Sequence, residues 1–219
     1  MKVKLEHYTP LHILVQAIRT CYDSGERSDN LGTKDIKLIN TIISNGHTST
    51  LEHINFSFYI EGFTRCCLQE LSRHRIASFS VKSTRYTLKE LKDEKPFIKR
   101  ERLQNLDRTK LIFDYKRASK YIKLLDIADI DNASVEALEN IRMLISEGKH
   151  PLDKIKYCLP ECYLTNEMLT INLRSLRNFL SLRTSPRAHF EIRELANEIA
   201  ETLPKDYHFL IEDCLHEQK

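Results

Sequence analysis

One stretch of the chain, residues 73–85, gathers positive charge without an acid of its own. It reads RHRIASFSVKSTR and carries four basic side chains, one imidazole and three serines. Basic groups held this close repel one another unless solvent screens them or an outside anion neutralises them. Phosphate suits that role because a planar guanidinium matches two phosphate oxygens at once. The stretch therefore predicts a phosphate-binding site, and the alternative is a solvated basic surface.

Glycine is scarce, which limits how a nucleotide could be held. The five glycines of the 219 residues are Gly25, Gly32, Gly46, Gly62 and Gly148. None of them are spaced as a G-x-G-x-x-G or Walker loop requires. Phosphates would have to be bound by side chains and helix N-termini instead.

Charge, hydropathy and cysteine content argue against a nucleic-acid coat protein, a membrane protein and a disulfide-rich or metal-binding protein. A net charge of +3 is too small for a general nucleic-acid coat. The sequence has no apolar run near the ~18 residues of a membrane span and no signal peptide, so we expect a soluble, cytoplasmic protein. The six cysteines lack C-x-x-C spacing and should be reduced thiols. His150, Cys158 and Cys162 lack a fourth ligand, so we expect no metal site.

The basic stretch resembles the signature of the flavin-dependent thymidylate synthases, which is Arg-His-Arg, seven residues, then Ser. Here the motif runs from Arg73 to Ser83. Further segments resemble the same family in the same order, and four ordered matches are far more specific than one. The other segments are 46–53, 172–180, and Leu182-Arg183 followed by 188–193.

The resemblance implies a reaction and an assembly. The reaction would be reductive methylation of dUMP to dTMP, with methylenetetrahydrofolate as one-carbon donor and NADPH-reduced FAD as hydride source. Residues 1–219 would form a single domain with a non-Rossmann fold. The family further implies a homotetramer whose sites combine several subunits, with dUMP and folate as partners and no nucleic acid or membrane.

The resemblance also assigns residues to the cofactor. His47 and His53 would lie near the flavin, where a structural histidine is the alternative. The implied FAD ligands are Ser49, Arg73, His74, Arg75, Val81, Asn172, Leu173, Arg174 and Asn178.

Substrate residues are implied in the same way. Arg183 would be catalytic, polarising the pyrimidine and favouring its N3-ionised form. No acid stands one helical turn before it, so we expect an acceptor from outside the chain. Ser80, Val81 and Glu70 depart from the commoner Asn, Glu and Gln of the family. The implied dUMP ligands are Glu70, Leu71, Ser72, Arg73, Val81, Lys82, Ser83, Thr84, Arg85, Lys156 and Arg183.

Hydrophobic periodicity predicts the elements that must position these residues. Strict alternation over 54–61 predicts a strand, and a second strand is expected over 163–172. Helical spacing without βαβ alternation then indicates an α+β class, an antiparallel sheet flanked by helices. An exposed excursion is expected over 87–105. Helices are expected over 9–20, 36–43, 64–72, 106–125, 134–145, 176–183, 188–201 and 205–216.

Two rival functions remain open from the residues. One is a nucleotide- or RNA-binding module built on residues 73–85, although Phe79 is the only aromatic residue there and base stacking favours several. The other is a transferase with Ser83 as nucleophile. That rival lacks the G-x-S-x-G context and an adjacent base.

Overall fold

The computed structural model describes residues 1–102 and 109–216. The chain divides into two compact units, and the single domain predicted over 1–219 remains a prediction. Unit 1 comprises Met1–Glu61, Gln69–Ser80 and Glu167–Lys219, and unit 2 comprises Gly62–Leu68 and Val81–Asn166.

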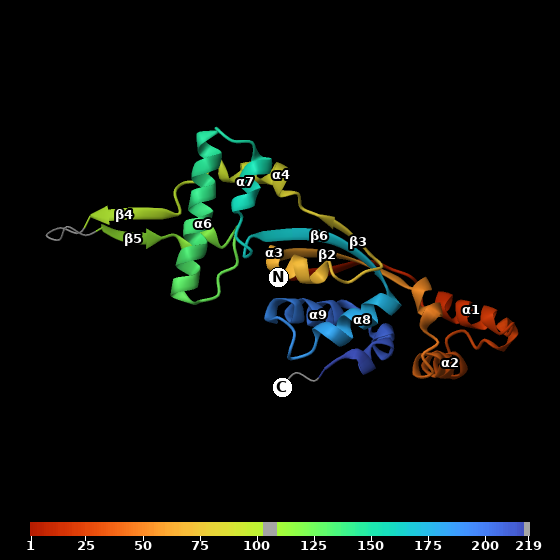
Figure 1. The fold of residues 1–219 in the computed structure, drawn as a ribbon. Helices are drawn as coiled ribbons and strands as arrows, with labels where there is room; N and C mark the ends of the chain where they lie inside the picture. The colour runs from red at the N-terminus through yellow and green to blue at the C-terminus, as the bar shows by residue number, and fades with distance from the viewer. Residues whose placement is uncertain (103–108, 217–219) are drawn as a thin grey trace. The chain divides into compact units, whose positions relative to one another are not determined.

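A sheet of four strands, counted among the described residues, forms the framework (Figure 1). β1 and β2 pair antiparallel, with a register shift between Leu5 and His7. Together with the helices this confirms the α+β class. In order across the sheet the strands are β1 (Lys2–Tyr8), β2 (Asn55–Thr64), β6 (Leu164–Asn172) and β3 (Ala77–Val81).

The core of unit 1 follows from the alternation in β2. Phe56, Phe58 and Ile60 are fully buried, because successive residues of a strand point to opposite faces. The Tyr207 ring meets Phe56 edge-on at 5.7 Å. Helices α8 (Leu173–Arg183) and α9 (Phe190–Thr202) pack on each other and lie along one face of the sheet (Figure 1).

The remaining elements of unit 1 are helical. They precede β2 or follow α9. They are α1 (His12–Cys21), α2 (Thr33–Ser44) and 3-10 turns at Gly25–Arg27, Thr48–His53, Lys205–Leu210 and Glu212–Cys214. Helix α3 (Arg65–Leu71) begins in unit 2 and ends in unit 1.

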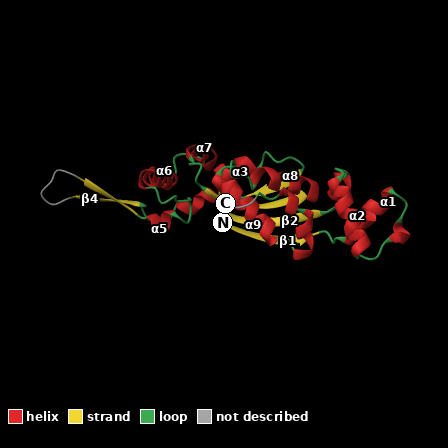
Figure 2. Cartoon of the chain, turned by 90° about the horizontal axis from the view of Figure 1, so that it is seen from below, coloured by secondary structure: helices red, strands yellow, loops and turns green. Residues whose placement is uncertain are grey.

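Unit 2 has its own apolar core and its own strand pair. Val135, Leu138 and Ile141 of the longest helix pack there with the fully buried Leu88 and Leu91. Figure 2 shows β4 in a two-stranded ribbon with its antiparallel partner β5. The elements are α4 (Thr84–Thr87), β4 (Ile98–Arg102), β5 (Thr109–Phe113), α5 (Tyr115–Ala118), α6 (Ala128–Glu147), α7 (Leu152–Ile155) and 3-10 turns at Leu88–Leu91 and Lys156–Cys158.

The helix predicted over 106–125 is wrong in its described part. The described part of 106–125 contains strand β5 and only the short helix α5, while residues 106–108 lie outside the described residues. β5 pairs with β4 residue by residue, from Ile98 opposite Phe113 onward. That pairing supplies backbone hydrogen bonds that a search for helical periodicity does not register. The described part of the exposed excursion predicted over 87–105 contains β4 and a 3-10 turn whose Leu88 and Leu91 are buried, while residues 103–105 lie outside the described residues.

Other boundaries differ from the predictions. Residues 205–216 form short 3-10 turns and not one α-helix. Helix α1 begins at His12 with Leu11 as N-cap and no side-chain cap, so the predicted start at Thr9 is wrong. The strand β3 was not predicted. Along the described parts of the chain, no helix is both long and apolar enough to cross a membrane.

Candidate functional site

The junction between β6 and α8 places the first group of predicted site residues. Asn172 ends the strand, and its side chain accepts a hydrogen bond from the Ser175 N–H at 2.9 Å. This N-cap satisfies an orphan donor of the first turn, so the helix starts without a loop. Arg174 and Asn178 are exposed on the same helix face, and Arg174 pairs with Glu52 at 2.6 Å.

The end of α3 places the second group. Leu71 is buried, and its carbonyl accepts from the His74 N–H at 3.0 Å. His74 is only 6% exposed, whereas the neighbouring Arg73 and Arg75 are exposed. Ile76, which follows the motif, has φ 62°. A left-handed backbone is strained for a β-branched residue, and it turns the chain from α3 into β3.

Arg183, the last residue of α8, reaches this second group. Its Nη1 donates to Glu70 Oε2 at 2.9 Å, its Nη2 to the Glu70 carbonyl at 3.3 Å, and its Nε to His74 Nε2 at 2.8 Å. The chain itself therefore supplies an acid partner for Arg183, and an additional acceptor from outside the chain stays a prediction. The acid lies 113 residues away in sequence, where no local spacing rule could find it.

Glu70 is shared by two cations. Its Oε1 accepts from Arg73 Nη1 at 3.2 Å while its Oε2 faces Arg183. The Arg73 side chain is 71% exposed, so that pair contributes little to stability. The Arg183 side chain is only 17% exposed, so its pair with Glu70 is better shielded from solvent.

Unit 2 carries the residues predicted to bind phosphate. Lys82 is anchored on β6 through its N–H, which donates to the Asn166 carbonyl at 2.8 Å. Its ammonium donates to both oxygens of Glu90, at 3.1 and 3.3 Å. Glu90 also accepts from the buried Tyr163 hydroxyl at 3.0 Å. Sequence reasoning missed Glu90 and Tyr163, since neither lies in a motif.

The other basic groups of unit 2 are open to solvent. Arg85 is exposed and lies over the Tyr86 ring, 5.6 Å from its centroid. Lys156 is exposed on its 3-10 turn. Ser83 is exposed as the N-cap residue of α4, and Thr84 is buried.

The predicted site residues are divided between the two compact units. The 3-10 turn Thr48–His53 packs against α8 and exposes Ser49, His47 and His53. Exposed guanidinium and amide groups form a donor set that fits the diphosphate and ring edges of FAD. The predicted residues of unit 1 are Ser49, Glu70, Leu71, Ser72, Arg73, His74, Arg75, Asn172, Leu173, Arg174, Asn178 and Arg183, and those of unit 2 are Val81, Lys82, Ser83, Thr84, Arg85 and Lys156.

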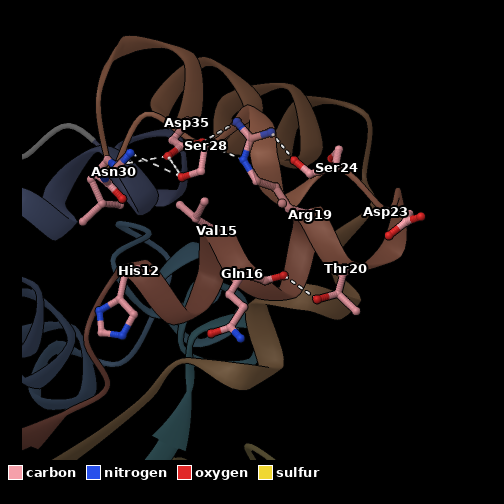
Figure 3. A pocket seen from close by; sticks show the side chains of 12 residues that line it. His12, Val15, Gln16, Arg19, Thr20, Asp23, Ser24, Ser28, Asn30 and Asp35 are labelled. Carbon is pink, nitrogen blue, oxygen red and sulfur yellow. Dashed lines mark hydrogen bonds and ion pairs between the residues drawn. The ribbon is translucent and has the colours of Figure 1, made fainter.

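A pocket of about 470 Å³ lies beside α1 (Figure 3), and none of the predicted site residues lines it. Arg19 and Asp35 form a buried ion pair in its wall, and Ser28 donates to Asp35 at 2.7 Å. Burial alone would raise the pKa of Asp35, but hydrogen bonds from Ser28, Arg19 and Leu31 outweigh it and lower the pKa to about 2. The hydrogen bonds of Arg19 and Asp35 fix the backbone of residues 24–32, so we assign this ion pair a structural role.

Comparisons with known proteins agree with the motifs. The family described as "Thymidylate synthase complementing protein" matches residues 4–207. The flavin-dependent thymidylate synthase of Campylobacter jejuni (strain RM1221) is 48% identical over 217 residues, covering 99% of this chain and 98% of the relative. That of Helicobacter pylori (strain ATCC 700392 / 26695) is 47% identical over 216 residues, covering 98% and 99%.

A solved structure extends the likeness to three dimensions. Thymidylate Synthase X from Helicobacter pylori, crystallised with FAD and dUMP, superposes with a TM-score of 0.88 at 45% identity, covering 99% of this chain and 100% of that one. Similarity over nearly the whole length defines an enzyme of the flavin-dependent thymidylate synthase type. The chain belongs to the thymidylate synthase complementing protein family, which confirms the resemblance.

Proposed function

We propose that the protein converts dUMP to dTMP, taking the one-carbon unit from methylenetetrahydrofolate and reducing equivalents from NADPH through FAD. The observation that carries the proposal is the meeting of Arg183 with Glu70 and His74 across more than 100 residues. Bound FAD supplies the hydride chemistry, and the protein supplies orientation and charge.

In unit 1, Arg183 stabilises charge that develops on the pyrimidine. A guanidinium stays protonated at any working pH and aims several N–H donors in a fixed plane. Glu70, Leu71, Ser72 and Arg73 frame the same nucleotide. The FAD ligands of this unit are Ser49, Arg73, Arg75, Asn172, Leu173, Arg174 and Asn178.

In unit 2, the predicted site residues bind the phosphate group of dUMP. Ser83 and Thr84 offer hydroxyls, and Lys82, Arg85 and Lys156 offer cations. Val81 contacts both FAD and dUMP through its backbone. Phosphate must displace Lys82 in part from Glu90, which holds it at 3.1 Å, so the dianion of a phosphomonoester competes better than a singly charged anion.

The proposal includes assembly and location. The protein acts in the cytoplasm as a homotetramer of single-domain, non-Rossmann subunits, because no self-contained dinucleotide fold holds FAD in one chain. Dilution or salt that yields monomers should then release flavin. A verified monomer that keeps stoichiometric FAD would contradict shared sites.

The test of function is direct. The purified protein should be yellow, and dTMP should form only when dUMP, methylenetetrahydrofolate and NADPH are all present. Arg183→Ala should bind flavin but form dTMP far more slowly. A colourless protein that binds RNA would favour the rival binding module, and flavin binding without dTMP formation would overturn the reaction.

A further inference from the structure

The Arg183 side chain is held on three sides before any substrate is present. Three of its five N–H groups are donated, to His74 Nε2, Glu70 Oε2 and the Glu70 carbonyl. Each terminal nitrogen keeps one N–H with no acceptor among the described residues. The guanidinium therefore retains two donors on its terminal nitrogens, which suits a pair of adjacent acceptors.

His74 is itself rigidly held. It is 6% exposed, and its ring meets the buried Phe179 edge-on at 4.9 Å and 86°. The backbone N–H of His74 donates to the Leu71 carbonyl at 3.0 Å. Packing against α8 therefore fixes the ring, and the hydrogen bond that the backbone N–H donates to the end of α3 fixes the backbone.

The contact with Arg183 defines the protonation state of the imidazole. Arginine has only donors, so Nε2 of His74 must be an acceptor and the ring proton must lie on Nδ1. Burial, and then the charge of Arg183, lower the pKa of His74 from 6.5 to about 4, while Glu70 acts in the opposite direction. The imidazole is therefore neutral at pH 7.

We infer that His74 is a positioning residue for Arg183: its neutral imidazole accepts from Nε and, with Glu70, fixes the plane of the guanidinium. The inference rests on the proposed function of Arg183 and gives His74 a different role from the FAD ligand that the resemblance implies. A charged imidazole would repel the guanidinium, and an apolar ring would leave Nε without an acceptor.

The inference can be tested with two variants of His74. His74→Phe keeps a ring against Phe179 but removes the acceptor, and His74→Gln restores an acceptor oxygen. Because a displacement of about 1 Å can cost about 10²-fold in rate, we expect kcat for dTMP formation to fall about 10²-fold in the Phe variant and to recover at least about tenfold in the Gln variant. FAD content and NADPH-driven flavin reduction should change by less than about threefold.

A matched control is His12→Phe, which replaces an exposed histidine of α1 and should behave as the parent. Loss of FAD and of flavin reduction in both His74 variants would show a cofactor ligand and overturn the inference. Unchanged kcat in His74→Phe would overturn it as well.

A spectroscopic readout separates this inference from the proposed function. In ¹⁵N spectra of the parent at pH 7, His74 should carry its proton on Nδ1 and none on Nε2. The Arg183 Nε–H signal, assigned by its absence in Arg183→Lys, should shift in His74→Phe. If the parent forms no dTMP, the proposed reaction fails while these signals still decide the positioning role. A proton on Nε2 would overturn that role even if no His74 variant folds.

Discussion

Glu167 is the buried acid with the clearest consequence for stability. It lies on β6, is 1% exposed, and neither carboxylate oxygen has a hydrogen-bond partner among the described residues. It shares its strand face with Leu169 and Ile171, both buried. Removing a charged carboxylate from water is costly without a partner, and this burial raises the pKa of Glu167 from 4.5 to about 7.

The size of the effect follows from linkage. Between pH 4.5 and 7 the folded chain binds the Glu167 proton more tightly than the unfolded chain, so stability falls as the pH rises through that window. A difference of about 2.5 pH units corresponds to ~3 kcal/mol. This contribution to the free energy of unfolding is present below pH 4.5 and lost above pH 7.

Glu167→Gln removes the titration while keeping the shape of the side chain. Relative to the parent, the variant should gain ~3 kcal/mol in free energy of unfolding between pH 4.5 and pH 8. Urea denaturation followed by circular dichroism at several pH values measures this, with Glu61→Gln on the exposed face of β2 as control. A constant difference between Glu167→Gln and the parent across that range would refute the reasoning, because it would mean that the carboxylate is paired or solvated.

Further predictions concern catalysis, capping and the buried ion pair. Arg183→Ala should slow dTMP formation about 10²-fold or more, with Arg183→Lys intermediate; stopped-flow traces should show NADPH reduction of flavin nearly unchanged, and equal losses in both half-reactions would indicate a structural role. Ser83→Ala should raise KM for dUMP yet leave turnover measurable; complete loss of turnover with a trapped Ser83 adduct in the parent would contradict a ligand role. Asn172→Ala should cost ~1 kcal/mol by uncapping α8, with Asn172→Ser close to the parent in thermal denaturation. Asp35→Asn should cost ~3–5 kcal/mol in free energy of unfolding at pH 7, because it breaks a buried ion pair. Folding lowers the pKa of Asp35 from 3.8 to about 2, so the parent loses the stability contributed by the ionised carboxylate as the pH falls from 3.8 to about 2. The Asn variant should not show this loss.

Local patterns predicted some elements well. Alternation over 54–61 gave β2, and apolar spacing after Asn172 gave α8, because each pattern reports a single buried face. The strand β3 was not predicted from the sequence, because its residues Ala77–Val81 mix serines with apolar residues and pair with β6, which lies far along the chain. Pairing partners distant in sequence leave no local signal.

The same limit applies to the site. The motifs identified the basic residues, since clustered charge is visible in a single segment. Glu70 was identified only as a dUMP ligand, and its pairing with Arg183 was not predicted because the two residues meet only through the fold. Glu90 was not identified, because it follows Lys82 by eight residues on a separate turn. Counting cations without their acids therefore overstated the need for an outside anion.

The division into units also has a consequence for synthesis of the chain. Unit 1 is built from three separate segments, and its last segment begins only at Glu167. At ~5–20 residues per second, the ribosome needs roughly 5–20 s to make the about 90 residues that separate Ser80 from Asn172. During that interval β2 has no β6 beside it, and Arg183 does not yet exist. Translation that stops after Asn166 would yield every segment of unit 2 and none of the helix that carries Arg183.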